Sequence, residues 1–168
     1  MYIKRYIEDT ILELHRTFKI IYLAGPRQVG KTTVLQHLGA QTGAQTVSLD
    51  DLRLRELALK DPELFLDSYQ TPLIIDEVQY APQLFPALKR RVDARAAKGQ
   101  YWLTGSQQFS SLRHIQESLA GRVAILTLLG FSSAERERVP KKSTPTFLSR
   151  ERPAPRIREQ NIYTRIFR

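Results

Sequence analysis

The chain of 168 residues contains no cysteine and only 3 histidines. Without cysteine it can form neither a disulfide framework nor a thiolate zinc site. His15, His37 and His114 are scattered without the spacing of metal ligands, so we expect each on a surface or a helix face. No apolar run approaches the length of about 18 residues that a membrane span needs, and charges interrupt the first ten residues, where a signal peptide needs an apolar stretch. We therefore expect a cytoplasmic protein with one core and no membrane contact.

One stretch stands out against these absences, K-I-I-Y-L-A-G-P-R-Q-V-G-K-T-T-V-L-Q-H-L at residues 19–38. Its centre fits the phosphate-loop pattern G-x-x-x-x-G-K-[ST], with an apolar β-prone run before it and apolar residues at helical spacing after it. Gly25 and Gly30 allow backbone conformations and a close approach that let successive N–H groups point at phosphate oxygens. Lys31 is predicted to reach the β- and γ-phosphates, and the Thr32 hydroxyl to ligate Mg²⁺.

A second chemical landmark is L-I-I-D-E at residues 73–77, an apolar strand that ends in two carboxylates. In an open α/β sheet, the carboxyl end of such a strand lies beside the phosphate loop. Asp76 is predicted to hold Mg²⁺ through water, and Glu77 to orient or deprotonate the attacking water. The two landmarks together predict a nucleotide site.

Hydrophobic periodicity and cap residues predict the other elements. We expect helices at 2–18, 52–60, 87–98 and 107–120, a helical turn from 61 to 66, and strands at 46–50, 100–106 and 123–129. Asp50 or Asp51 is expected to cap the helix at 52–60, and Asp61 to cap the turn that begins at Pro62. The basic outer face of the helix at 87–98 is typical of a solvated surface.

Charge and proline gather at the end of the chain. Residues 132–168 hold 10 of the 26 basic and 4 of the 17 acidic residues, which is +6 of the net charge of +9. They also hold 4 of the 9 prolines and little apolar periodicity, which favours an extended linker. We therefore divide the chain into residues 1–135, an ATP-binding domain, and 136–168, a linker or the truncated start of a C-terminal segment. Nucleic acid is expected to bind this basic tail only weakly, because its aromatic residues form no stacking platform.

Four motifs in order, GPRQVGKTT, LIIDEVQYAP, LTGSQQF and ESLAGRVAILTLLGFS, resemble the AAA-domain ATPases of bacteria and archaea. These belong to the AAA+ superfamily and usually carry a further C-terminal domain of unknown function. The resemblance covers about residues 1–135 and resumes at 157–168. It implies an α/β fold of three layers, with a parallel sheet in the order 5-1-4-3-2, residues 19–24 at its centre and residues 46–50 at its edge. The chain ends where the further domain would begin, so we expect a truncated member.

Residue by residue, the resemblance implies ATP and Mg²⁺ as ligands and gives Asp76 and Glu77 their metal and catalytic roles. The implied nucleotide contacts are Gly25, Pro26, Arg27, Gln28, Val29, Gly30, Lys31, Thr32 and Thr33. A sensor role falls on Thr104 or Ser106, where AAA+ proteins often carry asparagine instead. Arg122 is either a charge-compensating catalytic arginine or the partner of a salt bridge.

Three functions fit these residues. The first is a Mg²⁺-dependent ATPase whose cycle drives conformational change, acting as a homo-oligomer or with the further domain. The second is a small-molecule kinase on the same scaffold, although Glu77 directly after Asp76 favours water as the acceptor. The third is a nucleotide-gated binding module without catalysis, with weak nucleic-acid contacts through the tail.

Overall fold

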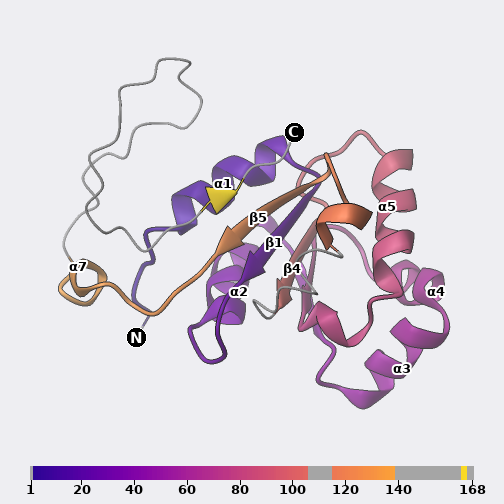
Figure 1. The fold of residues 1–168 in the computed structure, drawn as a ribbon, viewed down its shortest axis with the longest axis horizontal. Coiled ribbons are helices and arrows are strands. Elements are labelled where there is room, and N and C mark those ends of the chain that lie inside the picture. Colours follow the sequence, from indigo (N-terminus) through magenta and orange to yellow (C-terminus); the bar gives the residue numbers. More distant parts are fainter. Residues whose placement is uncertain (1, 106–114, 139–163, 166–168) are drawn as a thin grey trace.

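The structure is a computed structural model that describes residues 2–105, 115–138 and 164–165 (Figure 1). Its centre is a parallel sheet in the order β2-β3-β4-β1-β5. The strands are β1 (Ile20–Ala24), β2 (Gln45–Ser48), β3 (Leu73–Asp76), β4 (Tyr101–Gly105) and β5 (Val123–Thr127). This order confirms the one that the resemblance implies. The two-residue strand β6 (Thr164–Arg165) adds an antiparallel pairing to β5.

β1 is an inner strand of the sheet, and all five of its residues are buried. It pairs in parallel with β4 on one side and with β5 on the other, so that Ile20 lies opposite both Tyr101 and Val123. Parallel strands covered on both faces are continuous apolar runs, as the sequence Ile-Ile-Tyr-Leu-Ala shows. The carboxyl end of β1 therefore delivers the phosphate loop to the middle of the sheet edge.

Helices connect the strands and cover the sheet. They are α1 (Glu8–Thr17), α2 (Lys31–Thr42), α3 (Leu52–Lys60), α4 (Pro62–Asp67), α5 (Leu84–Ala94), α7 (Ser133–Arg136) and the short 3₁₀ helix η1 (Val78–Tyr80). The predicted caps are confirmed, because the Asp51 carboxylate accepts the Arg53 N–H at 2.8 Å and the Asp61 carboxylate accepts the Leu64 N–H at 3.0 Å.

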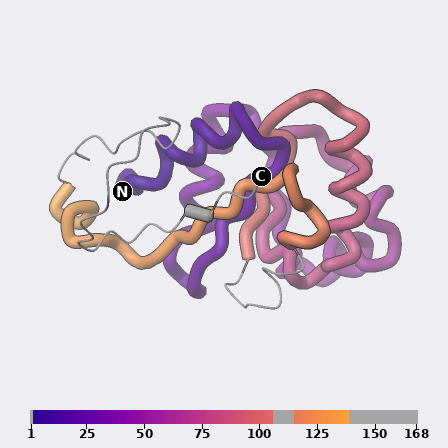
Figure 2. The backbone as a smooth tube through the Cα atoms, turned by 45° about the horizontal axis from the view of Figure 1, so that its top comes forward, coloured from indigo at the N-terminus to yellow at the C-terminus, as the bar shows by residue number. Residues whose placement is uncertain are grey.

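Two apolar layers enclose the sheet because side chains alternate along each strand. Ile21 and Leu23 pack in a layer with residues of α1 and α2. Ile20 and Tyr22 face the other way, into a layer with residues of α3, α4 and α5. Figures 1 and 2 show α3, α4 and α5 together on one side and α1 and α2 on the other. The fold thus has the three layers that were expected.

Helices α1 and α5 have bounds in the structure that differ from the predicted ones. α1 begins at Glu8 and not at residue 2, because the backbone N–H of Arg5 donates to the Glu8 carboxylate and residues 2–5 run outside the helix. α5 begins earlier and ends earlier than the predicted 87–98. Leu84 and Phe85 are already buried in it, and the backbone becomes extended at Arg95.

α7 lies where the sequence suggested the start of a linker. Its capping box explains it, since the Ser132 side chain accepts the Glu135 N–H and the Glu135 carboxylate accepts the Ser132 N–H. Most of the expected linker, residues 139–163, and the predicted helix up to residue 114 lie outside the described residues, while residues 115–118 are helical.

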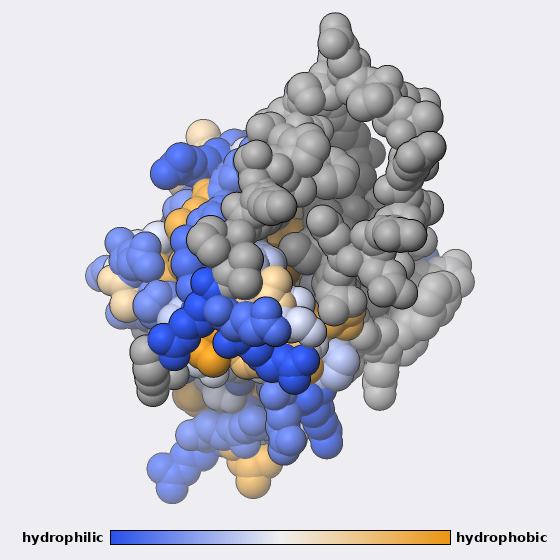
Figure 3. Space-filling view, turned by 90° about the vertical axis from the view of Figure 1, so that its left-hand side faces the viewer, coloured by the Kyte–Doolittle hydropathy of each residue, from blue (hydrophilic) through white to orange (hydrophobic). Residues whose placement is uncertain are grey.

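No helix in the described ranges is long and apolar enough to cross a membrane. On the face shown in Figure 3, the described residues present mainly hydrophilic side chains, with single apolar ones between them.

Candidate functional site

The phosphate loop connects the end of β1 to the start of α2. Gly30 has a φ of 89°, which glycine adopts at little cost, and Gln28 also has a positive φ of 62°. Gly25 is required for a different reason than expected. A Cβ at this position would lie 2.3 Å from the carbonyl oxygen of Leu128, so Gly25 lets the loop pack against the segment that follows β5.

Lys31 is the first residue of α2, and its side chain is buried in the loop. Its ammonium donates to the carbonyl oxygens of Gly25 at 3.1 Å and of Pro26 at 2.8 Å. The positive charge therefore lies within the loop, at the N-terminal end of the α2 dipole, where an anion is favoured.

The loop meets the second landmark through a direct contact. The Thr32 hydroxyl donates to the Asp76 carboxylate at 2.6 Å, although the two residues are 44 positions apart. Asp76 ends β3 and is only 7% exposed. The structure therefore brings together the two residues predicted to hold a metal.

These two groups fit Mg²⁺, which prefers hard oxygen ligands and usually takes only one or two carboxylates from a protein. Among the described residues, no group of three or more histidine, cysteine or acidic side chains forms an all-protein metal cage. The fit is thus to a metal that takes most of its ligands from water and phosphate.

Thr104, at the end of β4, lies between the two acidic residues. Its hydroxyl is fully buried, donates to the Asp76 carboxylate, and accepts the Glu77 N–H at 3.0 Å. Of the two sensor candidates, Thr104 is thus in direct contact with the site, and Ser106 lies outside the described residues.

Glu77 follows β3 in a left-handed conformation, with φ 55° and ψ 43°. This conformation is uncommon for a residue with a Cβ and is typical of functional sites. The Gln79 amide donates to the Glu77 carboxylate, while the Gln79 Oε1 atom is buried and has no hydrogen-bond partner among the described residues. Burial, followed by the charge of Glu77, raises the pKa of Tyr22 far above its usual value.

The sequence analysis missed Gln79 and Tyr22. Two signals could have found them: Gln79 stands two residues after Glu77, and Tyr22 carries the one polar side chain in an otherwise aliphatic strand. Gly105 makes room for both, because a Cβ there would lie 2.2 Å from the Tyr22 hydroxyl and 2.8 Å from the Gln79 Oε1 atom.

Arg122 lies at the other end of the sheet. It directly precedes β5, so the length of that strand, about 17 Å at roughly 3.3 Å per residue, separates it from the end where the phosphate loop lies. Its guanidinium pairs with Asp93 in two contacts of 2.6 and 2.8 Å. That hydrogen-bonded pair raises the pKa of Arg122. Within one chain, the structure therefore places Arg122 in a salt bridge and not beside the loop.

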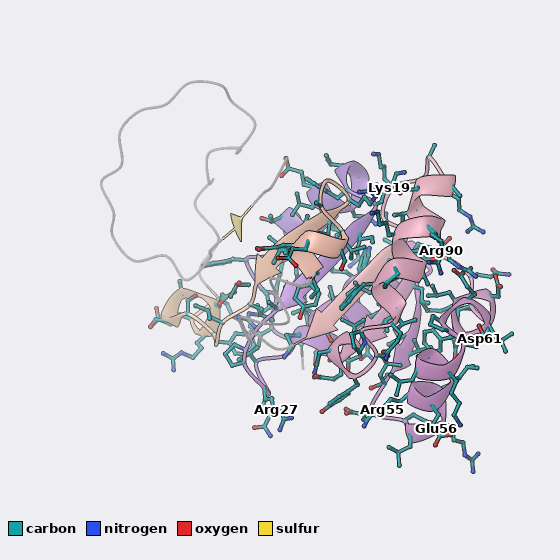
Figure 4. The ribbon with its side chains drawn as sticks, turned by 45° about the vertical axis from the view of Figure 1, so that its right-hand side comes forward. Lys19, Arg27, Arg55, Glu56, Asp61 and Arg90 are labelled. Atoms are coloured by element: carbon teal, nitrogen blue, oxygen red, sulfur yellow. The ribbon has the colours of Figure 1, made fainter. Side chains whose placement is uncertain are left out.

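A pocket of about 380 Å³ lies at this same end of the sheet, lined in part by Lys19, Asp93 and Arg122. Figure 4 shows that this pocket and the phosphate loop lie at opposite ends of β1, because Lys19 precedes the strand and Arg27 follows it.

The other predicted nucleotide contacts lie on the surface of the phosphate loop. Arg27 points outward from it (Figure 4). The exposed residues are Pro26, Arg27, Gln28 and Thr33, and the partly buried ones are Val29 and Gly30.

Residues 17–137 match the family described as AAA domain. An uncharacterised protein of Mycobacterium tuberculosis and one of Mycobacterium bovis are each 34% identical over 119 residues. That match covers 71% of this chain and 26% of each relative, so the chain spans about a quarter of the length of these relatives.

Two solved structures share the fold. The Walker-type ATPase of Pyrococcus abyssi gives a TM-score of 0.53 at 15% identity, covering 80% of this chain and 55% of its own. A DNA replication initiation factor gives a TM-score of 0.52 at 14% identity, and the match covers 79% of this chain and 46% of the factor. The family and the fold together indicate a nucleotide-binding protein of the ATPase type.

Proposed function

The chain belongs to the AAA domain family, and we propose that it binds ATP with Mg²⁺, hydrolyses it to ADP and phosphate, and couples its nucleotide state to a conformational change. The observation that carries the proposal is the 2.6 Å contact between Thr32 and Asp76, beside the buried ammonium of Lys31. These groups come from two separate segments and meet at the carboxyl edge of the sheet, where open α/β sheets bind their ligands.

Each group of the loop has a role in binding. The backbone N–H groups of residues 25–33, apart from Pro26, which has none, and the N-terminus of α2 would hold the phosphates. Lys31 would move from the loop carbonyls to the β- and γ-phosphate oxygens. Thr32 and Asp76 would hold Mg²⁺, which when bound neutralises charge that develops on the phosphate oxygens.

Glu77 would orient or deprotonate the attacking water. Thr104 fixes its backbone by accepting the N–H, and Gln79 fixes its carboxylate by donating to it. A carboxylate directly after the metal-binding Asp76 favours water over an alcohol as the acceptor, so we prefer the ATPase to a small-molecule kinase. Release of phosphate that is unchanged by added acceptor alcohols is the expected result.

Arg122 can serve this reaction only through another subunit, since it lies far from the loop of its own chain. We propose that the 168-residue chain binds ATP but turns it over slowly as a monomer, in the cytoplasm. Turnover would rise with protein concentration if a homo-oligomer completes the site, because an arginine supplied by a neighbour is worth about 10³ to 10⁵ in rate.

The central test uses two variants with matched controls. Lys31→Ala is expected to abolish tight Mg·ATP binding in calorimetry, whereas Lys60→Ala, at an exposed site on α3, leaves it unchanged. Glu77→Gln is expected to keep ATP binding and to slow turnover roughly 10²- to 10⁴-fold, with Glu56→Gln as its control. Unchanged binding by Lys31→Ala would contradict the nucleotide site, and unchanged turnover by Glu77→Gln would contradict the water-activating role.

A further inference from the structure

Arg5 is a buried cation that the sequence analysis did not single out. Its side chain is only 3% exposed, and its guanidinium donates to three backbone carbonyls and one carboxylate. The carbonyls belong to Val29 at 3.0 Å, Leu129 at 2.7 Å and Gly130 at 3.3 Å, and the carboxylate to Glu135 at 3.1 Å. One side chain thus joins the N-terminal segment, the phosphate loop and the segment after β5.

Glu135 completes the charge balance of this cluster. Its carboxylate also accepts the N–H groups of Tyr6 at 2.9 Å and Ser132 at 2.8 Å. Although burial by itself raises the pKa of Glu135, the N–H groups of Ser132 and Tyr6 and the Arg5 guanidinium together hold it below its usual value. A buried pair with this many hydrogen bonds favours one fixed arrangement of the three segments.

The contact with Val29 bears directly on phosphate binding. A trans peptide directs its C=O and its N–H in opposite directions, and the only cis bond among the described residues precedes Pro72. Because Arg5 holds the Val29 carbonyl, the N–H of Gly30 points away from Arg5. That N–H belongs to the set that a phosphate loop presents to its ligand.

We propose that Arg5 is a positioning residue of the phosphate loop, which fixes the Val29–Gly30 peptide and ties it to residues 129–135. This inference rests on the proposed ATP site. Figures 1 and 2 show the N-terminal segment and α7 close together at one end of the molecule. Because one guanidinium holds both segments, phosphate binding at the loop and the arrangement of residues 129–135 stabilise each other reciprocally.

The test separates positioning of the loop from stability of the fold. Arg5→Met keeps a long apolar stem and removes the guanidinium. Glu135→Gln is the matched control, because it breaks the same buried ion pair and leaves Arg5 able to hold the Val29 carbonyl. The dissociation constant for Mg·ATP is measured by calorimetry, and the thermal midpoint by differential scanning fluorimetry, with binding measured well below the lowest midpoint.

Both single variants are expected to lower the thermal midpoint. Arg5→Met is expected to raise the dissociation constant about 10-fold or more, and Glu135→Gln to change it by less than about 3-fold. The double variant removes the unpaired buried charge, so it should regain stability relative to Arg5→Met without regaining ATP affinity.

Three outcomes would overturn the inference. Equal dissociation constants for Arg5→Met and the parent would contradict the positioning role and leave the proposed function standing. ATP affinity that recovers in step with stability in the double variant would do the same. A parent chain that binds no ATP would instead overturn the proposed function, and this inference with it.

Discussion

The hydroxyl of Thr104 provides a sharp test of the site geometry, because it bonds at once to the buried Asp76 carboxylate and to the partly buried Glu77 N–H. Thr104→Val replaces it by a methyl group of nearly the same shape. One hydrogen bond to the Asp76 carboxylate is lost, and the Glu77 N–H loses its acceptor. A bond to a charged group contributes about 1.5–3 kcal/mol and an unsatisfied buried donor costs about 1–3 kcal/mol. Since the two losses share one atom and are not additive, we expect a destabilisation of about 2–4 kcal/mol.

For a domain of this size, each kcal/mol shifts the thermal midpoint by about 3–4 °C, so Thr104→Val should lower it by roughly 6–16 °C. Thr104→Ser is the control. It keeps the hydroxyl and removes one buried methyl group, at a cost of about 1 kcal/mol. Differential scanning fluorimetry measures both midpoints. Equal shifts for the two variants, or a valine variant within about 3 °C of the parent, would show that the hydroxyl does not bridge Asp76 and Glu77.

Two further predictions follow from other contacts. Gly25→Ala places a Cβ 2.3 Å from the Leu128 carbonyl oxygen, so both the thermal midpoint and the ATP affinity should fall. Gly130→Ala is the control and should change neither, because a Cβ there meets nothing within 4 Å. Equal behaviour of the two variants would refute the packing argument. The indole N–H of Trp102, the single tryptophan, donates to His15 Nδ1 at 3.2 Å. Burial, followed by the charge of Arg16, lowers the pKa of His15. Its contribution to stability is therefore complete above its unfolded pKa of about 6.5 and is lost as the pH falls through that value toward the folded pKa. Tryptophan fluorescence should titrate with a midpoint below about 6.5 and stay flat in His15→Phe; a midpoint above that value would contradict the shift.

The sequence predicted the parts of the site that follow from local pattern and from a general rule of parallel sheets. The phosphate loop is a contiguous motif. The contact between Thr32 and Asp76 follows because the loop that leads to Thr32 starts at the carboxyl end of one parallel strand, and Asp76 ends another strand of the same sheet. The inner strands were also predictable because they are short apolar runs, whereas β2 at the edge is mostly polar, and the resemblance supplied the strand order.

The features that the sequence did not predict depend mainly on contacts between residues far apart in the chain. Arg5 reaches Leu129 and Glu135, which are 124 and 130 positions away, and no periodicity along the chain marks such a pairing. The first turn of the predicted N-terminal helix failed for a local reason, because the Glu8 carboxylate accepts the Arg5 N–H ahead of the helix. The position of Arg122 was predictable in principle, since a residue directly before a parallel strand lies at the end of the sheet opposite the loop.

The pairing of β1 has a consequence for the order in which the chain folds. Its two neighbours are β4 and β5, which begin 81 and 103 residues after Ile20. Pairings so distant in sequence form slowly, because a long loop must close first. During synthesis at about 5–20 residues per second, the strand that carries the phosphate loop thus waits several seconds for both partners. A nascent chain or a fragment that ends before Val123 leaves one edge of this apolar strand unpaired, and such an edge pairs readily with another chain. Release of β5 from the ribosome is therefore the step that covers the second edge of β1.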